Sequence, residues 1–248
     1  MKEWPKLGNP PVVAAMFQIH FDSGNLALED FSKFDNSIKE LGFPKRADGI
    51  EASLNVDQSR IPLGKSKISA TSDAKLIHYS YSSDDNKKKL TLSISSITYI
   101  DESDYEGWEK FTDSVINILS KLDSILGHRT IKRTSIRFLN QFNFDQFDDP
   151  TEYFKMVISS TEESLSYPLA KYAFKTTFKV SDVSHAVVNH FLDRVDERYI
   201  YILDLDILNS RNYEYNPSII LEILSQLREI KNTIFFDSVT DKLIELCN

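Results

Sequence analysis

Two aspartates stand two residues apart inside an apolar run, at Asp204 and Asp206. Side chains at this spacing point to the same face of a β-strand, so the two carboxylates would lie together. Such a pair can bind a divalent metal ion, or serve as general acid and base. The alternative is two polar residues on an exposed sheet face, and we favour it because carboxylate pairs are often structural. The double alanine variant should then fold normally, unless Arg137 or Lys175 pairs with the aspartates.

The histidines lack the spacing of a metal site. His185 and His190 are five residues apart, which places their rings on opposite faces of a strand, and no zinc-like spacing occurs among the other histidines. The basic clusters at 87–89 and 128–133 could contact phosphate, but solvated turn charge is the simpler interpretation. The sequence contains no glycine-rich phosphate loop and no Gly-x-Ser-x-Gly nucleophile motif. We therefore assign no catalytic residue, no metal ligand and no cofactor.

The composition is that of an acidic protein with a substantial apolar core. The 248 residues are 41% hydrophobic and carry a net charge of −8. This charge disfavours extensive contact with nucleic acid or with anionic membranes. The single cysteine, Cys247, cannot form a disulfide within the chain, which indicates a reducing cytoplasm. The apolar run over 12–17 is too short to span a bilayer.

Apolar periodicity predicts the elements of the first half. Alternation over 13–21 indicates a strand, and helical spacing over 28–41 indicates a short helix. Strands are predicted at 76–81 and 90–99, with a bulge at Ser95–Ser96 where the alternation changes phase. The pattern over 57–72 fits a strand or a loop. A long amphipathic helix follows at 108–126, with Ser103 or Asp104 as its N-cap.

The same order of elements returns in the second half. It consists of strands at 136–144, 172–180, 185–192 and 198–208, a short helix at 151–158, and a closing helix that begins at Asn216–Pro217. A last helical piece at 239–246 continues the closing helix, with or without a kink near Asn232–Thr233.

This repetition predicts an α+β fold of two pseudo-duplicated β-α-βββ-α units, 1–127 and 128–248, packed as one globule. Their strands would form a curved antiparallel sheet with helices on one face. By topology alone, the arrangement is analogous to TATA-binding-protein-like or helix-grip folds.

Four short segments of the chain form a further pattern. They are Leu7-x-Asn9-Pro10-Pro11-Val12-Val13-x-Ala15, Tyr105-x-x-Trp108-x-x-Phe111, Arg133-x-x-x-Arg137-Phe138-x-Asn140 and Phe235-Phe236-x-x-x-Thr240-Asp241. The pattern resembles a sporadically distributed family of uncharacterised bacterial proteins, in which tyrosine often stands at the position of Phe138. The resemblance implies no particular activity. The family's patchy occurrence resembles that of accessory genes, which implies a role in defence or in mobile elements.

Since no site motif is present, the exposed sheet face is the main candidate for function. By strand phase, its polar side chains are Gln18, His20, Ser93, Ser95, Arg137, Gln141, Asn143, Lys175, Thr177, Lys179, Asp204 and Asp206. We expect a non-enzymatic interaction protein whose binding face consists of Arg137, Gln141, Asn143, Lys175, Lys179, Asp204 and Asp206. A module that binds a ligand or nucleic acid on this face is the first alternative, and a metal-dependent hydrolase or nuclease is the second. The expected partner is a protein, a homodimer through unpaired edge strands is compatible with the pattern, and no membrane contact is expected.

Overall fold

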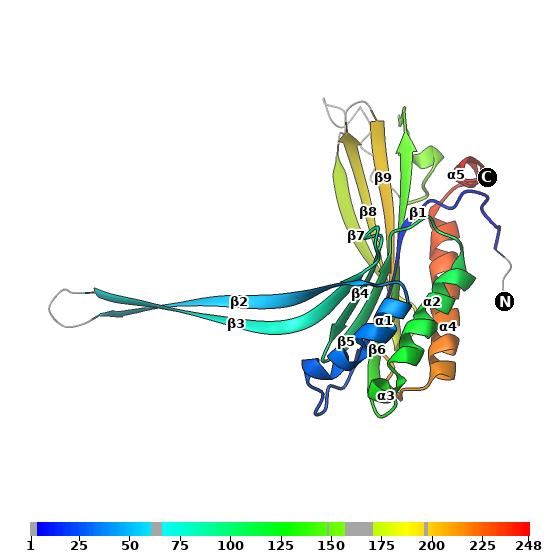
Figure 1. The fold of residues 1–248 in the computed structure, drawn as a ribbon. Coiled ribbons are helices and arrows are strands. Elements are labelled where there is room, and N and C mark those ends of the chain that lie inside the picture. The colour runs from blue at the N-terminus through cyan, green and yellow to red at the C-terminus, as the bar shows by residue number, and fades with distance from the viewer. Residues whose placement is uncertain (1–3, 61–65, 148, 157–170, 196–197) are drawn as a thin grey trace.

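The computed structural model describes residues 4–60, 66–147, 149–156, 171–195 and 198–248. For 51–60 and 66–75 it describes the backbone alone. Within these ranges the chain forms a ten-stranded antiparallel sheet with α-helices on one face (Figure 1). The first half contains β1 (Val12–Phe21), the 3-10 helix η1 (Leu28–Phe34), α1 (Asp35–Glu40), β2 (Lys45–Arg60), β3 (Ser66–Ser82), β4 (Lys88–Ser93), β5 (Ser96–Asp101), α2 (Trp108–Lys121) and α3 (Asp123–Leu126). The second half contains β6 (Thr130–Phe144), η2 (Pro150–Glu152), β7 (Tyr172–Lys179), β8 (Ser184–Val195), β9 (Arg198–Asn209), β10 (Tyr213–Glu214), α4 (Pro217–Ser238) and α5 (Asp241–Leu246). The predicted α+β class and the antiparallel sheet with its helices are confirmed.

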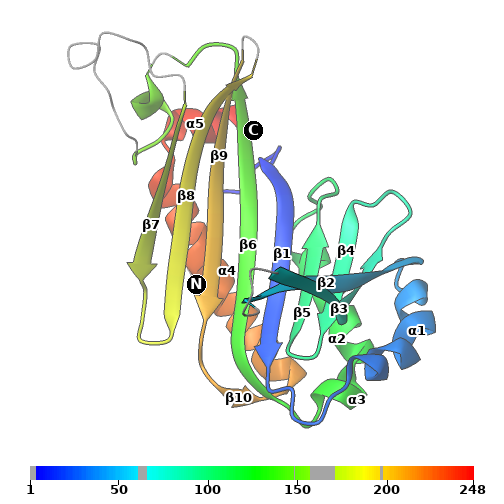
Figure 2. The same ribbon diagram turned by 90° about the vertical axis from the view of Figure 1, so that its left-hand side faces the viewer.

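The two halves of the chain meet at the centre of the sheet. The strand order is β2-β3-β4-β5-β1-β6-β9-β8-β7, and β10 pairs with β6 beside this path (Figure 2). The central pair is β1 with β6, in which Phe17 lies opposite Ile136. Because the sheet runs continuously across this pair, both halves share one core.

Alternation along the strands divides the sheet into a helix-covered face and an open face. Phe17, Phe138 and Leu203 are buried on the covered face, as period-2 geometry requires for apolar residues that alternate with polar ones. α2 and α4 lie across this face (Figure 1) and bury residues such as Val115 and Leu227 against it. None of the helices in the described ranges has both the length and the apolar character needed to cross a bilayer.

The predicted bulge at Ser95–Ser96 is wrong. Ile94 and Ser95 form a two-residue turn, and β4 and β5 pair on either side of it, beginning with Ser93 opposite Ser96. A change in alternation phase accompanies a tight hairpin as well as a bulge, which explains the error. The first half consequently has four strands after its short helices, where three were predicted.

The region over 57–72, which the sequence left open, belongs to the long hairpin of β2 and β3. β3 pairs with β4 only from Tyr79 to Ser82, so 50–60 and 66–76 pair only with each other among the described residues. We call this two-stranded ribbon the arm. It projects from the side of the sheet opposite the helices (Figure 1). At its base the register shifts after Gly49, where a side chain would collide with the ring of His78.

Two helical predictions in the second half need correction. The predicted helix at 151–158 is replaced by a short 3-10 helix, Pro150–Glu152, and 153–156 are not helical. Residues 157–158 lie outside the described residues. α4 runs without interruption to Ser238 and ends at Val239, which forms an isolated bridge with Phe154. Thr240 then caps α5 through its side chain. The break therefore lies seven residues beyond the predicted kink. The side chain of Thr240 accepts a hydrogen bond from the amide of Leu243 and so begins a new helix there.

Candidate functional site

The centre of the open face is organised by an arginine and a buried aspartate. Nε and a terminal nitrogen of Arg137 on β6 donate to the two oxygens of Asp204 on β9, at 2.8 and 2.7 Å. Asn189 of β8 adds a third hydrogen bond to Asp204, at 2.9 Å. The side chain of Asp204 is only 2% exposed, whereas that of Arg137 is 41% exposed. Asp204 therefore anchors Arg137 from below, and Arg137 presents its remaining donors to solvent.

Asp206 lies on the same face, but its environment differs from that of Asp204. Burial raises its pKa above the usual aspartate value, although Arg137, Arg133 and Lys175 partly oppose this effect. Both oxygens of Asp204 are occupied by Arg137 and Asn189. Over the described part of the chain, no group of three or more histidine, cysteine or acidic side chains is placed to hold a metal ion. The carboxylate of Asp204 is thus committed to Arg137 and Asn189, whereas Asp206 is not.

The other predicted binding-face residues also lie on the open side of their strands. Gln141 donates to Asn143 at 3.1 Å on β6, and both side chains accompany Arg137. On β7, Lys175 and Lys179 are exposed. Lys179 pairs with Asp182 at 2.9 Å, while Lys175 has no ion pair with a described residue.

A second polar network extends the face toward the first half. Gln18 of β1 donates to Thr98 of β5 at 2.8 Å and accepts from Arg133 of β6. His20 contacts the same Gln18 oxygen at 2.9 Å, and burial together with the charge of Arg133 lowers the pKa of this histidine. The sequence placed Arg133 in a basic turn. Its even spacing from Arg137 is the signal that assigns both to one face of a strand.

A cavity of about 570 Å³ opens on the helix-covered side of the sheet. Its walls come from residues 4–12, the loop at 105–107, the first turn of α2, Asn140 of β6 and the stretch 228–236 of α4. Two of the charged side chains that the sequence did not single out are Arg228 and Lys231, both on α4. Lys231 falls at helical spacing after Leu224 and Leu227 on the apolar stripe of α4, and this position could have identified it.

Residues 4–11 form a strap along one wall of this cavity. The amide of Asn9 donates to the carbonyl of Cys247 at 2.7 Å, and that of Gly8 donates to Oδ1 of Asn248 at 3.0 Å. Trp4 stacks on Phe236 of α4 with 5.1 Å between ring centroids. The strap is therefore fixed both to the C-terminal residues and to α4. The segments 7–15, 105–111, 133–140 and 235–241 all contribute residues to this cavity, and Phe138 lies directly behind it.

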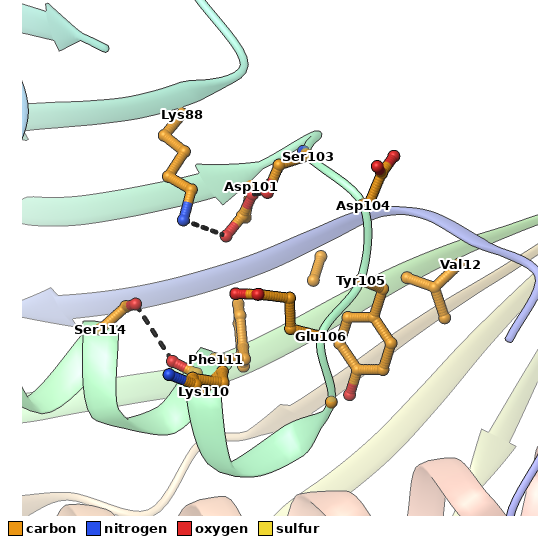
Figure 3. Close-up of a pocket in the computed structure, with 12 residues that line it drawn as sticks. Val12, Lys88, Asp101, Ser103, Asp104, Tyr105, Glu106, Lys110, Phe111 and Ser114 are labelled. Atoms are coloured by element: carbon orange, nitrogen blue, oxygen red, sulfur yellow. Dashed lines mark hydrogen bonds and ion pairs between the residues drawn. The ribbon is translucent and has the colours of Figure 1, made fainter.

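The start of α2 separates the large cavity from a small one of about 50 Å³, shown in Figure 3. The predicted caps of α2 are wrong, because Ser103 donates to Asp101 and the N-cap is Gly107, with φ 109° and no side-chain hydrogen bond. Lys88 also reaches Asp101, at 3.3 Å. The small cavity holds at most a water or two. The first turn of α2 remains without a side-chain cap where it meets the large cavity.

No protein-family model matches the chain, and no curated protein is significantly similar to it.

Proposed function

We propose that this protein is a protein-interaction module that binds an acidic surface of a partner protein on its open sheet face, beside the arm. The observation that carries the proposal is the charge of this face. Four cations, Arg133, Arg137, Lys175 and Lys179, share the face with three strand aspartates, Asp193, Asp204 and Asp206, of which Asp204 is buried beneath Arg137. The chain as a whole carries −8, so the open face is a locally cationic surface on an acidic protein.

The pairing of these charges favours a partner that supplies carboxylates. Neither Arg133 nor Lys175 forms a direct ion pair with a described residue, and the charges of both reach Asp206, whose own charge burial disfavours. Arg137 is held in place by Asp204 with part of its guanidinium in solvent. Cations that are pre-positioned in this way accelerate association with a complementary surface. An acidic partner surface meets this requirement.

Aliphatic side chains between the polar rows favour a protein over nucleic acid. Met16, Leu139 and Ile202 alternate with polar residues on the same face and are only partly buried. Protein interfaces combine an apolar centre with a polar rim. Sheets that bind single-stranded nucleic acid instead present aromatic platforms, whereas β1 and β6 carry no Phe, Tyr or Trp on this face and the exposed Phe191 stands apart on β8.

The arm adds a second wall to the proposed binding region. It projects on the open side of the sheet (Figure 1), and its strands pair only with each other beyond Tyr79. A partner on the open face would therefore meet the arm as well. Ribbons with unpaired edges readily add a strand from another chain.

Site-specific photo-crosslinking in native cells tests this proposal. A benzophenone amino acid at Gln141 on the open face should give a discrete adduct with a protein whose contact surface is acidic. The matched control replaces Gln226, on the outer surface of α4, and should not give that adduct. A Gln141 adduct with nucleic acid, or with a second copy of this chain, would refute the assignment to an acidic protein partner.

Charge reversal measured with the purified partner then tests the mechanism. Arg133→Glu and Lys175→Glu should each lower the association rate constant several-fold, with a smaller change in dissociation, because unpaired surface charges act mainly through steering. Lys39→Glu, on α1, is the control for net charge and should leave the rate constant nearly unchanged. Equal effects at Lys39 and Lys175 would show that only net charge matters.

We also propose that the two halves arose by duplication, with the chain acting as an accessory protein in bacterial defence or in mobile elements. Outward from the central pair, the strand order is β1, β5, β4, β3 in one half and β6, β9, β8, β7 in the other. In each half the first strand lies at the centre of the sheet and pairs with the last long strand of that half, and the two preceding strands follow outward. This match between the halves supports the duplication. The accessory role derives from the resemblance of the four sequence segments. Loss of a defence phenotype in an Arg133→Glu strain, with normal protein level, would connect the two proposals.

A further inference from the structure

Lys231 is a cation without a counter-ion inside the large cavity. It lies on the cavity wall formed by α4. Its ammonium forms no hydrogen bond or ion pair with any residue that the structure describes, and its nearest aromatic contact is Phe138, with Nζ 4.7 Å from the ring centroid. Cations in largely apolar surroundings normally have a paired anion. An anionic group that enters the cavity would therefore satisfy this ammonium.

The groups that face Lys231 from neighbouring elements do not supply this anion. Arg228, on the same helix, lies over the Trp108 ring at 5.3 Å and pairs with Glu109 of α2 at 3.5 Å. Tyr105 and Glu106 of the preceding loop, and Lys6 of the strap, complete the ionisable groups of the cavity wall. Burial, followed by the charge of Arg228, lowers the pKa of Lys231 to about 8. At neutral pH the amine is thus still mostly charged.

The first turn of α2 contributes a second electropositive feature to the same cavity. Gly107, Trp108 and Glu109 line the wall, and no side chain caps the helix. The amide groups of a first helical turn have no acceptor within the helix and favour negative charge. With φ at 109°, position 107 suits glycine, and a residue with a capping side chain would be strained there.

The remaining walls are suited to an apolar body. Trp4, Leu7, Pro10, Trp108, Phe235 and Phe236 all contribute to them. A volume of about 570 Å³ is typical of cavities that bind small organic molecules. Because Lys231 is a single unpaired ammonium and Glu106 and Glu109 share the wall, a ligand with one negative charge fits better than one with several.

We propose that this cavity binds a small monocarboxylate with an aromatic body, its carboxylate accepting hydrogen bonds from Nζ of Lys231 and its ring packing among Trp108, Phe235 and Phe236. The site lies on the opposite side of the sheet from the open face, so it is independent of the proposed partner binding.

The two tryptophans of the chain provide a direct assay. Both Trp4 and Trp108 line the cavity, so a ligand that enters it should change intrinsic fluorescence without any label. The probes are 3-phenylpropionate and its neutral counterpart 3-phenylpropionamide, with calorimetry as the second measurement. At pH 7 the carboxylate should bind with saturation and about tenfold or more tighter than the amide, as expected for a hydrogen bond to a charged donor.

Variants of Lys231 separate its role from that of the cavity. Lys231→Met should bind the carboxylate as weakly as the amide, while its amide affinity stays close to wild type and shows that the cavity is intact. Lys231→Arg should retain the preference for the carboxylate. Lys121→Met, on the exposed surface of α2, is the matched control and should behave as wild type.

A pH series on the wild-type protein tests the proposal without requiring any variant to fold. Since only the protonated amine pairs with the anion, the affinity for 3-phenylpropionate should fall as pH rises above about 8, while that for the amide stays level. The proposal is overturned if the wild-type protein does not prefer the carboxylate at pH 7, or if Lys231→Met keeps the preference. Calorimetric binding without a change in tryptophan fluorescence would overturn it as well.

Discussion

Arg137 forms its hydrogen bonds diagonally across the sheet. In the register of β6 and β9 it lies opposite Asp206, yet both of its bonding nitrogens reach Asp204, which is opposite Leu139. Asn189, directly opposite Asp204 on β8, donates to the same carboxylate. One buried aspartate thereby joins three neighbouring strands, whereas the charges of Arg137, Arg133 and Lys175 reach Asp206 only at longer range.

Single replacements of the two aspartates should therefore have unequal effects. Asp204→Ala should lower the free energy of unfolding by about 1–3 kcal/mol, because it leaves Arg137 and Asn189 without their shared acceptor. Asp206→Ala should change it by about 1 kcal/mol or less, since burial already disfavours its charged form. Urea denaturation at pH 7 measures both. Equal losses at the two positions would contradict the structural distinction.

A buried histidine should make the protein sensitive to acid. His190 is fully buried, its Nδ1 lies 2.7 Å from the Tyr201 hydroxyl, and its ring stacks on Phe174 at 4.3 Å. Burial lowers its pKa to about 4. The unfolded chain then binds one more proton than the folded chain between pH 6.5 and 4, so stability is lost as pH falls through this window, by up to about 3 kcal/mol.

The comparison with His190→Phe isolates this contribution. The variant should lose stability at pH 7.5 with its bond to Tyr201, but its unfolding free energy should depend less on pH between 6.5 and 4 than that of the wild type. His185→Phe, on the open side of the same strand, is the control. NMR titration of the His190 ring near pH 6.5 would contradict the expectation.

Lys231 should destabilise the unliganded protein. Its folded pKa of about 8 lies below the value of about 10.4 for an unfolded lysine. The penalty is therefore complete below pH 8 and is relieved as pH rises toward 10.4, where the folded chain has already released the proton. Lys231→Met should raise the free energy of unfolding at pH 7 by on the order of 1–3 kcal/mol, and this gain should shrink above pH 8. Thermal unfolding of both proteins across pH 6–10 measures the difference. A variant less stable than wild type at every pH would indicate a structural partner for the lysine.

The arm should be dispensable for the fold. Ile50 and Leu76 are register partners, so an Asn-Gly turn can replace residues 51–75 and close the hairpin. The melting temperature should stay within a few degrees of wild type, because the removed residues pair only with each other. The crosslink from Gln141 to the proposed partner should weaken or disappear. Unfolding of the shortened chain would show instead that the arm stabilises the sheet.

Periodicity in the sequence predicted the elements in which local pattern and tertiary burial agree. β7, β8 and β9 alternate cleanly, and α2 carries a continuous apolar stripe, so their positions could be read from the chain. The turn at Ile94–Ser95 was missed because two short strands with a two-residue connection differ from one bulged strand only by a change of phase.

The candidate sites depended on facts that no local pattern contains. Asp204 was expected on an exposed face, but its burial results from Arg137 and Asn189, which lie on different strands. The cap of α2 was placed at Ser103 or Asp104, whereas Asp101 binds Ser103 and Gly107 begins the helix. The cavity around Lys231 needs the strap, α2 and α4 together, and these are separated by about a hundred residues each along the chain.

The length of the arm sets the size of a molecule that can contact the sheet and the far end of the arm at the same time. Residues 50–60 rise by about 3.3 Å each, so its free part reaches roughly 35 Å from the sheet. A compact domain of about 100 residues has a similar diameter. One such domain could just touch the tip and the sheet at once, whereas an elongated molecule or a pair of molecules would fill the span with room for contacts. A partner of the kind proposed above would have to span roughly this distance to contact the open face and the far end of the arm together.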